Sequence, residues 1–182
     1  MLSANSITLI VGGARSGKSQ LAQKLAASHS SVVFVATARP VDDEMRRKIE
    51  RHKAERPSEW LTVEEQISLD RTVREYAPRF RVLLVDCLTL YAANLLSSTN
   101  DDWEAVLPNV QSFCNALREA KCSVVLVSNE VGSGIVPEYA SGRAFRDLLG
   151  AINQQVAAIA DNVVLMVAGL PLVLKGGLEA QP

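Results

Sequence analysis

The segment from Gly12 to Ser19 reads GGARSGKS and matches the pattern G-x-x-x-x-G-K-[ST] at every fixed position. Glycines allow the backbone to curl so that several N–H groups point at phosphate oxygens, and the helix that follows adds its positive end. In this pattern Lys18 is expected to reach the β- and γ-phosphates, and the Ser19 hydroxyl to ligate Mg²⁺. The sequence therefore predicts a loop that binds a nucleoside triphosphate, formed by Gly12, Gly13, Ala14, Arg15, Ser16, Gly17, Lys18 and Ser19.

Short apolar runs rich in Val, Ile and Leu recur along the chain, and helical patterns separate them. Runs that are continuously apolar, rather than alternating, are typical of parallel strands covered on both faces. Strand and helix in alternation indicate the α/β class with right-handed crossovers. We expect strands at Ile7–Val11, Val32–Ala36, Val82–Val85, Val124–Val127 and Val163–Val167, and helices at Lys18–Ala27, Asp42–Glu55, Trp103–Ala120 and Ala144–Ala160.

Two segments have a weaker pattern. Within Pro57–Ala77, Trp60–Val63 is expected to form a short strand, at an edge or in a hairpin, with a helix after it. In the tail, Leu172–Lys175 is expected to add a last strand. The chain has 182 residues, the usual size of one domain, and no internal repeat or low-complexity linker. We therefore expect residues 1–182 to form a single P-loop NTPase (RecA-like) domain, with a mostly parallel central sheet flanked by helices.

Charge and hydropathy exclude several classes of partner. The net charge is −1, so no broad basic surface is implied and we expect no nucleic-acid partner. The longest apolar run, Val163–Leu174, is too short for a membrane helix and contains Gly169 and Pro171, so no stable membrane insertion is expected. The three cysteines are odd in number and fit no zinc pattern, which favours buried free thiols in a reducing cytoplasm.

A carboxylate follows one of the apolar runs directly. Val82–Val85 ends at Asp86, and the carboxyl end of a core strand is where P-loop proteins place a residue that holds Mg²⁺, directly or through water. An Asp at the end of a strand is also a common cap for the next helix, here one beginning near Cys87. With a phosphate loop in the same chain, the metal role is the stronger interpretation, and it makes Ser19 and Asp86 the expected Mg²⁺ ligands.

The chain has two histidines, and their surroundings differ. His29 follows the first predicted helix and is expected at an exposed helix end. His52 lies among Arg51, Lys53 and Arg56, which would lower its pKa and attract phosphate. A lone histidine is more often structural than catalytic, but a neutral imidazole beside phosphate-binding cations can act as a nucleophile at phosphorus.

The segment Ser128–Glu138 follows a predicted strand and carries polar residues and two glycines. Ligands bind at the carboxyl ends of parallel strands in α/β sheets, so this loop is a candidate for substrate binding. The alternative is a plain flexible connection.

These motifs, taken together and in order, resemble one family: the bifunctional adenosylcobinamide kinase/adenosylcobinamide-phosphate guanylyltransferases of cobalamin biosynthesis. The resemblance covers almost the whole chain and is far more specific than the phosphate loop alone. The matching segments are 12–19, 36–38, 42–45, 52–57 with Trp60 and 63–65, 86–89 with 94–96, 129–138, and 143–147 with Gly150, Asn153 and Gln154.

The resemblance implies two reactions. A nucleoside triphosphate, ATP or GTP, phosphorylates the hydroxyl of the aminopropanol arm of adenosylcobinamide. GTP then guanylylates a histidine with release of pyrophosphate, and the GMP passes to adenosylcobinamide phosphate, giving adenosylcobinamide-GDP. Because the histidine of the family precedes an x-x-x-Arg-Pro pattern, His52 takes that role here, with Lys18 as the second catalytic residue. The same resemblance implies a homotrimer, and a guanine nucleotide site that includes Ala36, Thr37, Ala38, Lys53, Ala54, Glu55, Arg56, Glu64 and Asp86.

Two alternatives stay open from the sequence. A P-loop small-molecule kinase without guanylyltransferase activity would need no nucleophilic histidine, and a RecA-like motor or switch would predict hydrolysis stimulated by a macromolecule. One departure from the family pattern is also visible, because residues 139–142 read YASG where a more polar stretch is expected.

Overall fold

In the computed structural model, which describes residues 2–40, 42–54 and 56–177, the strands form one seven-stranded sheet of order β3-β2-β4-β5-β1-β6-β7. All neighbouring strands in it run parallel except the last pair, because β7 is antiparallel to β6. The sheet is therefore the mostly parallel sheet of an α/β P-loop fold that the sequence predicts. The strands are β1 (Ile7–Gly12), β2 (Val32–Ala36), β3 (Leu61–Glu64), β4 (Val82–Asp86), β5 (Ser123–Val127), β6 (Asn162–Val167) and β7 (Leu170–Lys175).

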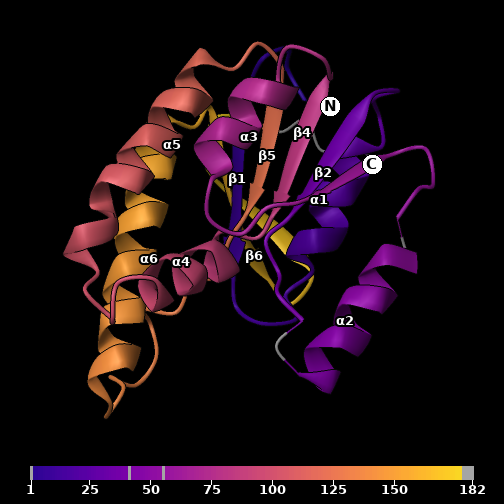
Figure 1. Cartoon of the computed structure of the whole chain (residues 1–182). Helices are drawn as coiled ribbons and strands as arrows, with labels where there is room; N and C mark the ends of the chain where they lie inside the picture. The colour runs from indigo at the N-terminus through magenta and orange to yellow at the C-terminus, as the bar shows by residue number, and fades with distance from the viewer. Residues whose placement is uncertain (1, 41, 55, 178–182) are drawn as a thin grey trace.

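Helices cover both faces of the sheet (Figure 1). One buried cluster joins one face of the strands to the four helices α3 to α6, and a second joins the other face to α1. Helix α2 is set apart from this packed body in Figure 1. The helices are α1 (Lys18–Ala26), α2 (Asp43–Ala54), α3 (Leu69–Tyr76), α4 (Leu88–Ser97), α5 (Leu107–Glu119) and α6 (Ala140–Ile159), with a short 3₁₀ turn at Glu104–Val106 before α5.

The central strands are apolar because both faces are covered. Every residue of β1, β2 and β5 is buried, and so are the first four residues of β4. The exception in β4 is Asp86, which is half-buried at the carboxyl end. Continuous apolar runs in the sequence therefore correspond to strands with no wet face.

The weaker sequence patterns are resolved as follows. The expected short strand is β3, which begins at Leu61 and is the outermost strand of the sheet. It pairs parallel to β2, so the alternative expectation of a hairpin is wrong. The tail strand is longer than expected, since β7 begins at Leu170, after a turn at Ala168 and Gly169 with φ of 52° and 84°. Both turn residues have positive φ, the geometry that two-residue hairpins favour.

Several helix boundaries also differ from expectation. Helix α6 begins at Ala140 rather than Ala144, and α5 begins at Leu107 rather than Trp103. Helix α2 spans Asp43–Ala54 where Asp42–Glu55 was expected, and Glu55 lies outside the described residues. The sequence does not predict helix α4 as a separate element, although the alternative role of Asp86 as a helix cap implied a helix beginning near Cys87.

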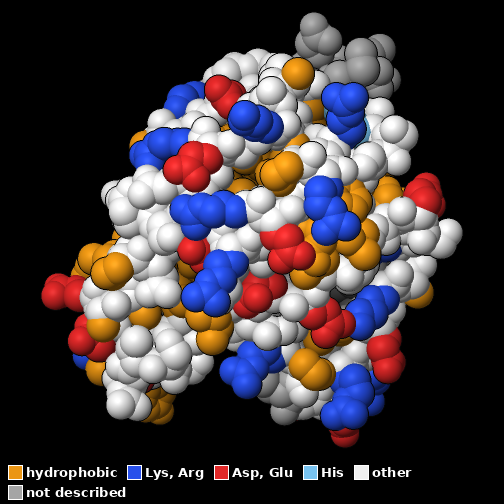
Figure 2. Space-filling view, turned by 45° about the horizontal axis from the view of Figure 1, so that its top comes forward, with side chains coloured by type: hydrophobic (Ala, Val, Ile, Leu, Met, Phe, Trp, Pro, Cys, Tyr) orange, Lys and Arg blue, Asp and Glu red, His pale blue; other side chains and the backbone are white. Residues whose placement is uncertain are grey.

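The surface carries charges of both signs. On the face shown in Figure 2, Lys and Arg side chains are interspersed with Asp and Glu side chains. None of the helices in the described parts of the chain is long and apolar enough to cross a membrane. All three cysteines are free thiols, with Cys114 and Cys122 buried and Cys87 half-buried.

Candidate active site

The register of the sheet aligns several of the predicted site residues in one row. Glu64 pairs with Ala36, Ala36 with Asp86, Asp86 with Val127, and Val127 with Ile10. All of these strands are parallel, so the row lies on the side of the sheet where their carboxyl ends meet, which we call the carboxyl edge. The phosphate loop begins just beyond Ile10, and the structure thus gathers residues far apart in the sequence at one edge.

The phosphate loop links β1 to α1 with a backbone that needs its glycines. A Cβ at Gly12 would collide with the carbonyl oxygen of Met166 on β6, and Gly17 caps α1 with a φ of 94°. Around Gly13 a Cβ would meet nothing within 4 Å, which leaves open space at the tip of the loop. Gly13, Ala14 and Arg15 are exposed there.

Lys18 lies inside this loop. Its side chain is buried, and its Nζ donates a hydrogen bond to the carbonyl oxygen of Gly13 at 2.6 Å, with Ser16 Oγ at 3.4 Å. The ammonium group is therefore held at the centre of the loop, where a phosphate oxygen can replace the Gly13 carbonyl as its partner. Ser19, the second residue of α1, is half-buried beside it.

Thr37 fixes the chain that follows Asp86. Its side chain is fully buried; its hydroxyl donates to the carbonyl oxygen of Cys87 at 2.7 Å and accepts from the Cys87 N–H at 2.8 Å. The carbonyl oxygen of Thr37 in turn accepts from Asn94 Nδ2 on α4 at 2.9 Å. Thr37 thus braces the end of β4, and its own hydroxyl is already engaged. The sequence assigned no role to Asn94; the available signal was a single amide in an otherwise apolar helix.

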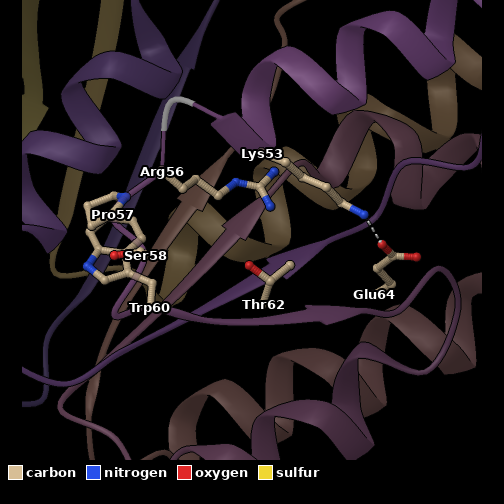
Figure 3. A pocket seen from close by; sticks show the side chains of 7 residues that line it. All are labelled: Lys53, Arg56, Pro57, Ser58, Trp60, Thr62 and Glu64. Atoms are coloured by element: carbon tan, nitrogen blue, oxygen red, sulfur yellow. Dashed lines mark hydrogen bonds and ion pairs between the residues drawn. The ribbon is translucent and has the colours of Figure 1, made fainter.

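The C-terminal end of α2 meets β3 at an open cavity of about 370 Å³. Lys53, Arg56, Trp60 and Glu64 are among the residues that line it, and Figure 3 shows Lys53 reaching across to Glu64. Their Nζ and Oε1 atoms are 2.6 Å apart, in an ion pair that is about half exposed on both sides. This pair connects the helix that carries His52 to the edge strand.

Arg56 is the charged group in this cavity with the most unusual surroundings. Its guanidinium lies over the ring of Phe34, 3.5 Å from the centroid, and its Nε and Nη1 atoms are buried without a hydrogen-bond partner among the described residues. Burial lowers the pKa of Arg56, and the charges of Asp86 and Glu64 act in the opposite direction. A buried donor without a partner is costly, so these two nitrogens are suited to an acceptor group of a ligand.

The other predicted site residues are placed as follows. Ala36 is buried, Ala38 is half-buried and Ala54 is exposed at the end of α2. His52 belongs to α2, directly before Lys53, but its side chain lies outside what the structure describes, as does the whole of Glu55. His29, expected to be exposed, is half-buried, and its Nε2 atom has no partner among the described residues.

Known structures of low sequence identity share this fold. The flagellar accessory protein FlaH from Methanocaldococcus jannaschii superposes with a TM-score of 0.54 at 17% identity, covering 96% of this chain and 80% of that chain. An ATPase from the type III secretion system of pathogenic bacteria gives a TM-score of 0.61 at 13% identity, covering 94% and 57%. These similarities bear on the fold alone.

Sequence relatives are much closer. The chain is 45% identical over 169 residues to the bifunctional adenosylcobalamin biosynthesis protein CobP of Pseudomonas aeruginosa, covering 92% of this chain and 96% of the relative. It is 40% identical over 178 residues to CobU of Escherichia coli, covering 92% and 98%. Residues 8–174 match the family model described as cobinamide kinase / cobinamide phosphate guanyltransferase. The chain therefore belongs to the cobinamide kinase / cobinamide phosphate guanyltransferase family.

Proposed function

We propose that this chain phosphorylates adenosylcobinamide with a nucleoside triphosphate and then transfers GMP from GTP to adenosylcobinamide phosphate. The observation that carries the proposal is the intact phosphate loop, with Lys18 buried inside it, in a chain of this family. The kinase-only alternative gains no support, because the relatives are named as bifunctional proteins. The products of the second reaction are adenosylcobinamide-GDP and pyrophosphate.

In this proposal the nucleotide lies along the carboxyl edge of the sheet. The amides of the loop and Lys18 hold its phosphates, and the cavity at the end of α2 holds the guanosine part of GTP. Arg56 supports this placement, since its buried Nε and Nη1 atoms have no hydrogen-bond partner among the described residues and can donate to an acceptor group of the nucleotide. Ala36, Thr37 and Ala38 would contribute their backbone, because the Thr37 side chain is engaged with Cys87.

The oxygen donors at this edge fit Mg²⁺. Asp86 and Ser19 are both half-buried and both offer hard oxygen ligands, and Mg²⁺ keeps several waters when proteins bind it. An Mg²⁺ ion held by Asp86 and Ser19 would reduce the negative charge on the phosphates of ATP or GTP. Thr37 would keep Asp86 in position through the Cys87 backbone.

His52 serves as the nucleophile of the second reaction. A neutral imidazole nitrogen forms a bond to the α-phosphorus of GTP, and the bond from that phosphorus to the oxygen bridging to the β-phosphate breaks. Pyrophosphate leaves with the electron pair, and Lys18 and the loop amides stabilise its charge. The phosphate of adenosylcobinamide phosphate then takes the GMP unit, which regenerates the imidazole.

Labelling with GTP that carries ³²P at the α-phosphate tests this proposal. We expect the wild-type protein to form an acid-labile, base-stable adduct, and His52→Ala to form none. His29→Ala is the matched control, because His29 is the other histidine of the chain and lies on the connection between α1 and β2. Label that persists in His52→Ala, or its absence from the wild-type protein, would contradict the guanylyltransferase proposal.

We also propose that the protein is a cytoplasmic homotrimer. Free thiols suit a reducing compartment. The β6–β7 hairpin supports self-association, because Leu170, Leu172 and Leu174 are all more than half exposed, and apolar patches of this kind mark interaction surfaces. Light scattering during gel filtration should give a trimer mass for the wild-type protein and for Ile67→Lys, and a monomer mass for Leu172→Lys. A trimer mass for Leu172→Lys would exclude this hairpin as the interface.

A further inference from the structure

The segment that follows β5 occupies the position between the phosphate loop and Asp86. Strand β5 lies between β1 and β4 in the sheet, and Val127 pairs with Ile10 on one side and with Asp86 on the other. The chain then continues along β1, with Ser128 N–H donating to the Ile10 carbonyl oxygen at 2.9 Å. Whatever follows Ser128 is therefore beside the loop that holds the phosphates.

Side chains from two helices fix this segment. Ser128 is fully buried, and its Oγ donates to Asn153 Oδ1 on α6 at 2.6 Å. Asn153 Nδ2 donates back to the Asn129 carbonyl oxygen at 3.0 Å, and the Asn129 N–H donates to Thr89 Oγ1 on α4 at 2.9 Å. A partly buried network of side-chain hydrogen bonds of this kind specifies one backbone position.

Glu130 is the next residue, and it makes direct contact with the phosphate loop. Its N–H donates to the carbonyl oxygen of Gly12 at 3.1 Å. Its carboxylate is exposed, and Oε1 accepts a hydrogen bond from the Gly132 N–H at 2.6 Å. A Cβ at Gly132 would come within 2.9 Å of that oxygen, so glycine there makes room for the carboxylate.

Other carboxylates at this edge of the sheet have different partners. Glu64 is ion-paired with Lys53, and Glu65 accepts from the N–H groups of Ile67 and Ser68 at the start of α3. Asp86 is the proposed metal ligand. Among the acidic residues that the structure describes at the carboxyl ends of the parallel strands, Glu130 is the one beside the phosphate loop without a cationic partner.

We propose that Glu130 is the general base of the kinase step, an inference that rests on the proposed function. The hydroxyl oxygen of adenosylcobinamide forms a bond to the γ-phosphorus, the bond from that phosphorus to the β–γ bridging oxygen breaks, and the nucleoside diphosphate leaves with the electron pair. The hydroxyl proton passes to the carboxylate of Glu130. Protein kinases use a carboxylate in the same way. GMP transfer starts from a phosphate that is already ionised, so it has no need of this base.

Glu130→Gln separates the two reactions. The glutamine side-chain oxygen can still accept from the Gly132 N–H, so the loop keeps its geometry, but the amide cannot take a proton. Kinase activity is measured as transfer of ³²P from γ-labelled ATP to adenosylcobinamide, and GMP transfer is measured separately with adenosylcobinamide phosphate supplied. We expect the kinase kcat to fall by about 10²–10⁴-fold, the usual contribution of a general base, with GMP transfer unchanged.

Glu75→Gln is the matched control, since Glu75 is an exposed carboxylate on α3, outside the loop and the proposed nucleotide site. It should retain wild-type kinase activity. Kinase activity that survives in Glu130→Gln, or equal loss of both reactions, overturns the role of Glu130 while leaving the proposed function intact. Failure of the wild-type protein to phosphorylate adenosylcobinamide refutes the proposed function itself.

Discussion

Replacing Thr37 by Val tests whether the brace at the end of β4 holds Asp86 in place. Valine has nearly the same shape, so the substitution removes the hydroxyl without opening a cavity. The Cys87 carbonyl oxygen keeps a second hydrogen bond, from the Tyr91 N–H at 3.2 Å, but the Cys87 N–H loses the acceptor it has in Thr37 Oγ1. The variant therefore buries an unsatisfied donor.

The magnitude follows from these contacts. An orphaned buried N–H costs about 1–3 kcal/mol, and the lost bond to the carbonyl oxygen adds about 1 kcal/mol. We expect Thr37→Val to lower the free energy of unfolding by about 2–4 kcal/mol, which corresponds to a fall in Tm of roughly 5–15 °C for a chain of this size. Thr37→Ser keeps the hydroxyl and removes one methyl group, so it should cost about 1 kcal/mol.

Urea denaturation followed by circular dichroism measures both variants. The functional readout is the Mg²⁺ concentration that gives half-maximal kinase activity at saturating ATP. It should rise several-fold in Thr37→Val and stay near the wild-type value in Thr37→Ser, because only the former loses the brace. Equal stability and equal Mg²⁺ dependence in the two variants would refute the argument that the hydroxyl positions Asp86.

Further predictions concern the loop, the cavity and the core. Gly12→Ala should lower the free energy of unfolding by about 2 kcal/mol or more, measured by urea denaturation, because the new Cβ collides with the Met166 carbonyl oxygen. Arg56→Met should weaken GTP binding about tenfold or more, measured by calorimetry. It should not lower the stability of the protein, because it removes a buried charge and keeps an apolar side chain over Phe34. Arg79→Met is the control: it removes a guanidinium that lies over Tyr76 and should leave GTP affinity unchanged. Burial raises the pKa of Cys122 from 9.0 to about 11. The thiol therefore loses its proton at lower pH in the unfolded chain, and the free energy of unfolding should fall as pH rises from about 9 to 11. Urea titrations at several pH values should show that this fall is smaller in Cys122→Ala.

Much of the fold could be predicted from the sequence because its signals are local. Val82–Val85 is apolar throughout since β4 is covered on both faces, and the phosphate loop has a fixed local pattern. Helix α4 was missed because it is apolar almost all round, which hides the periodicity of an amphipathic helix. The start of α6 was placed too late because Ser141 and Gly142 are weak helix formers.

The hydrogen bonds that support the site could not be predicted from the sequence. Thr37 bonds to Cys87, 50 positions away, and Ser128 bonds to Asn153, 25 positions away. Serine, threonine and asparagine are ordinary surface residues in most chains, and only the register of the parallel strands brings these pairs together. The motif matches included Thr89, Asn94 and Asn153 but could not say that their side chains hold backbone at the sheet edge.

The position of β5 between two parallel neighbours has a consequence for how such a domain can change. Its pairing with β1 and β4 along Val124–Val127 anchors the strand on both sides, so the loop beyond Gly132 begins from a fixed stem. The exposed side chains of that loop, Ile135 and Tyr139 among them, can be exchanged or lengthened without moving the triphosphate cradle. A graft of residues 133–139 between relatives would therefore test whether this loop sets acceptor preference while the phosphate chemistry stays constant.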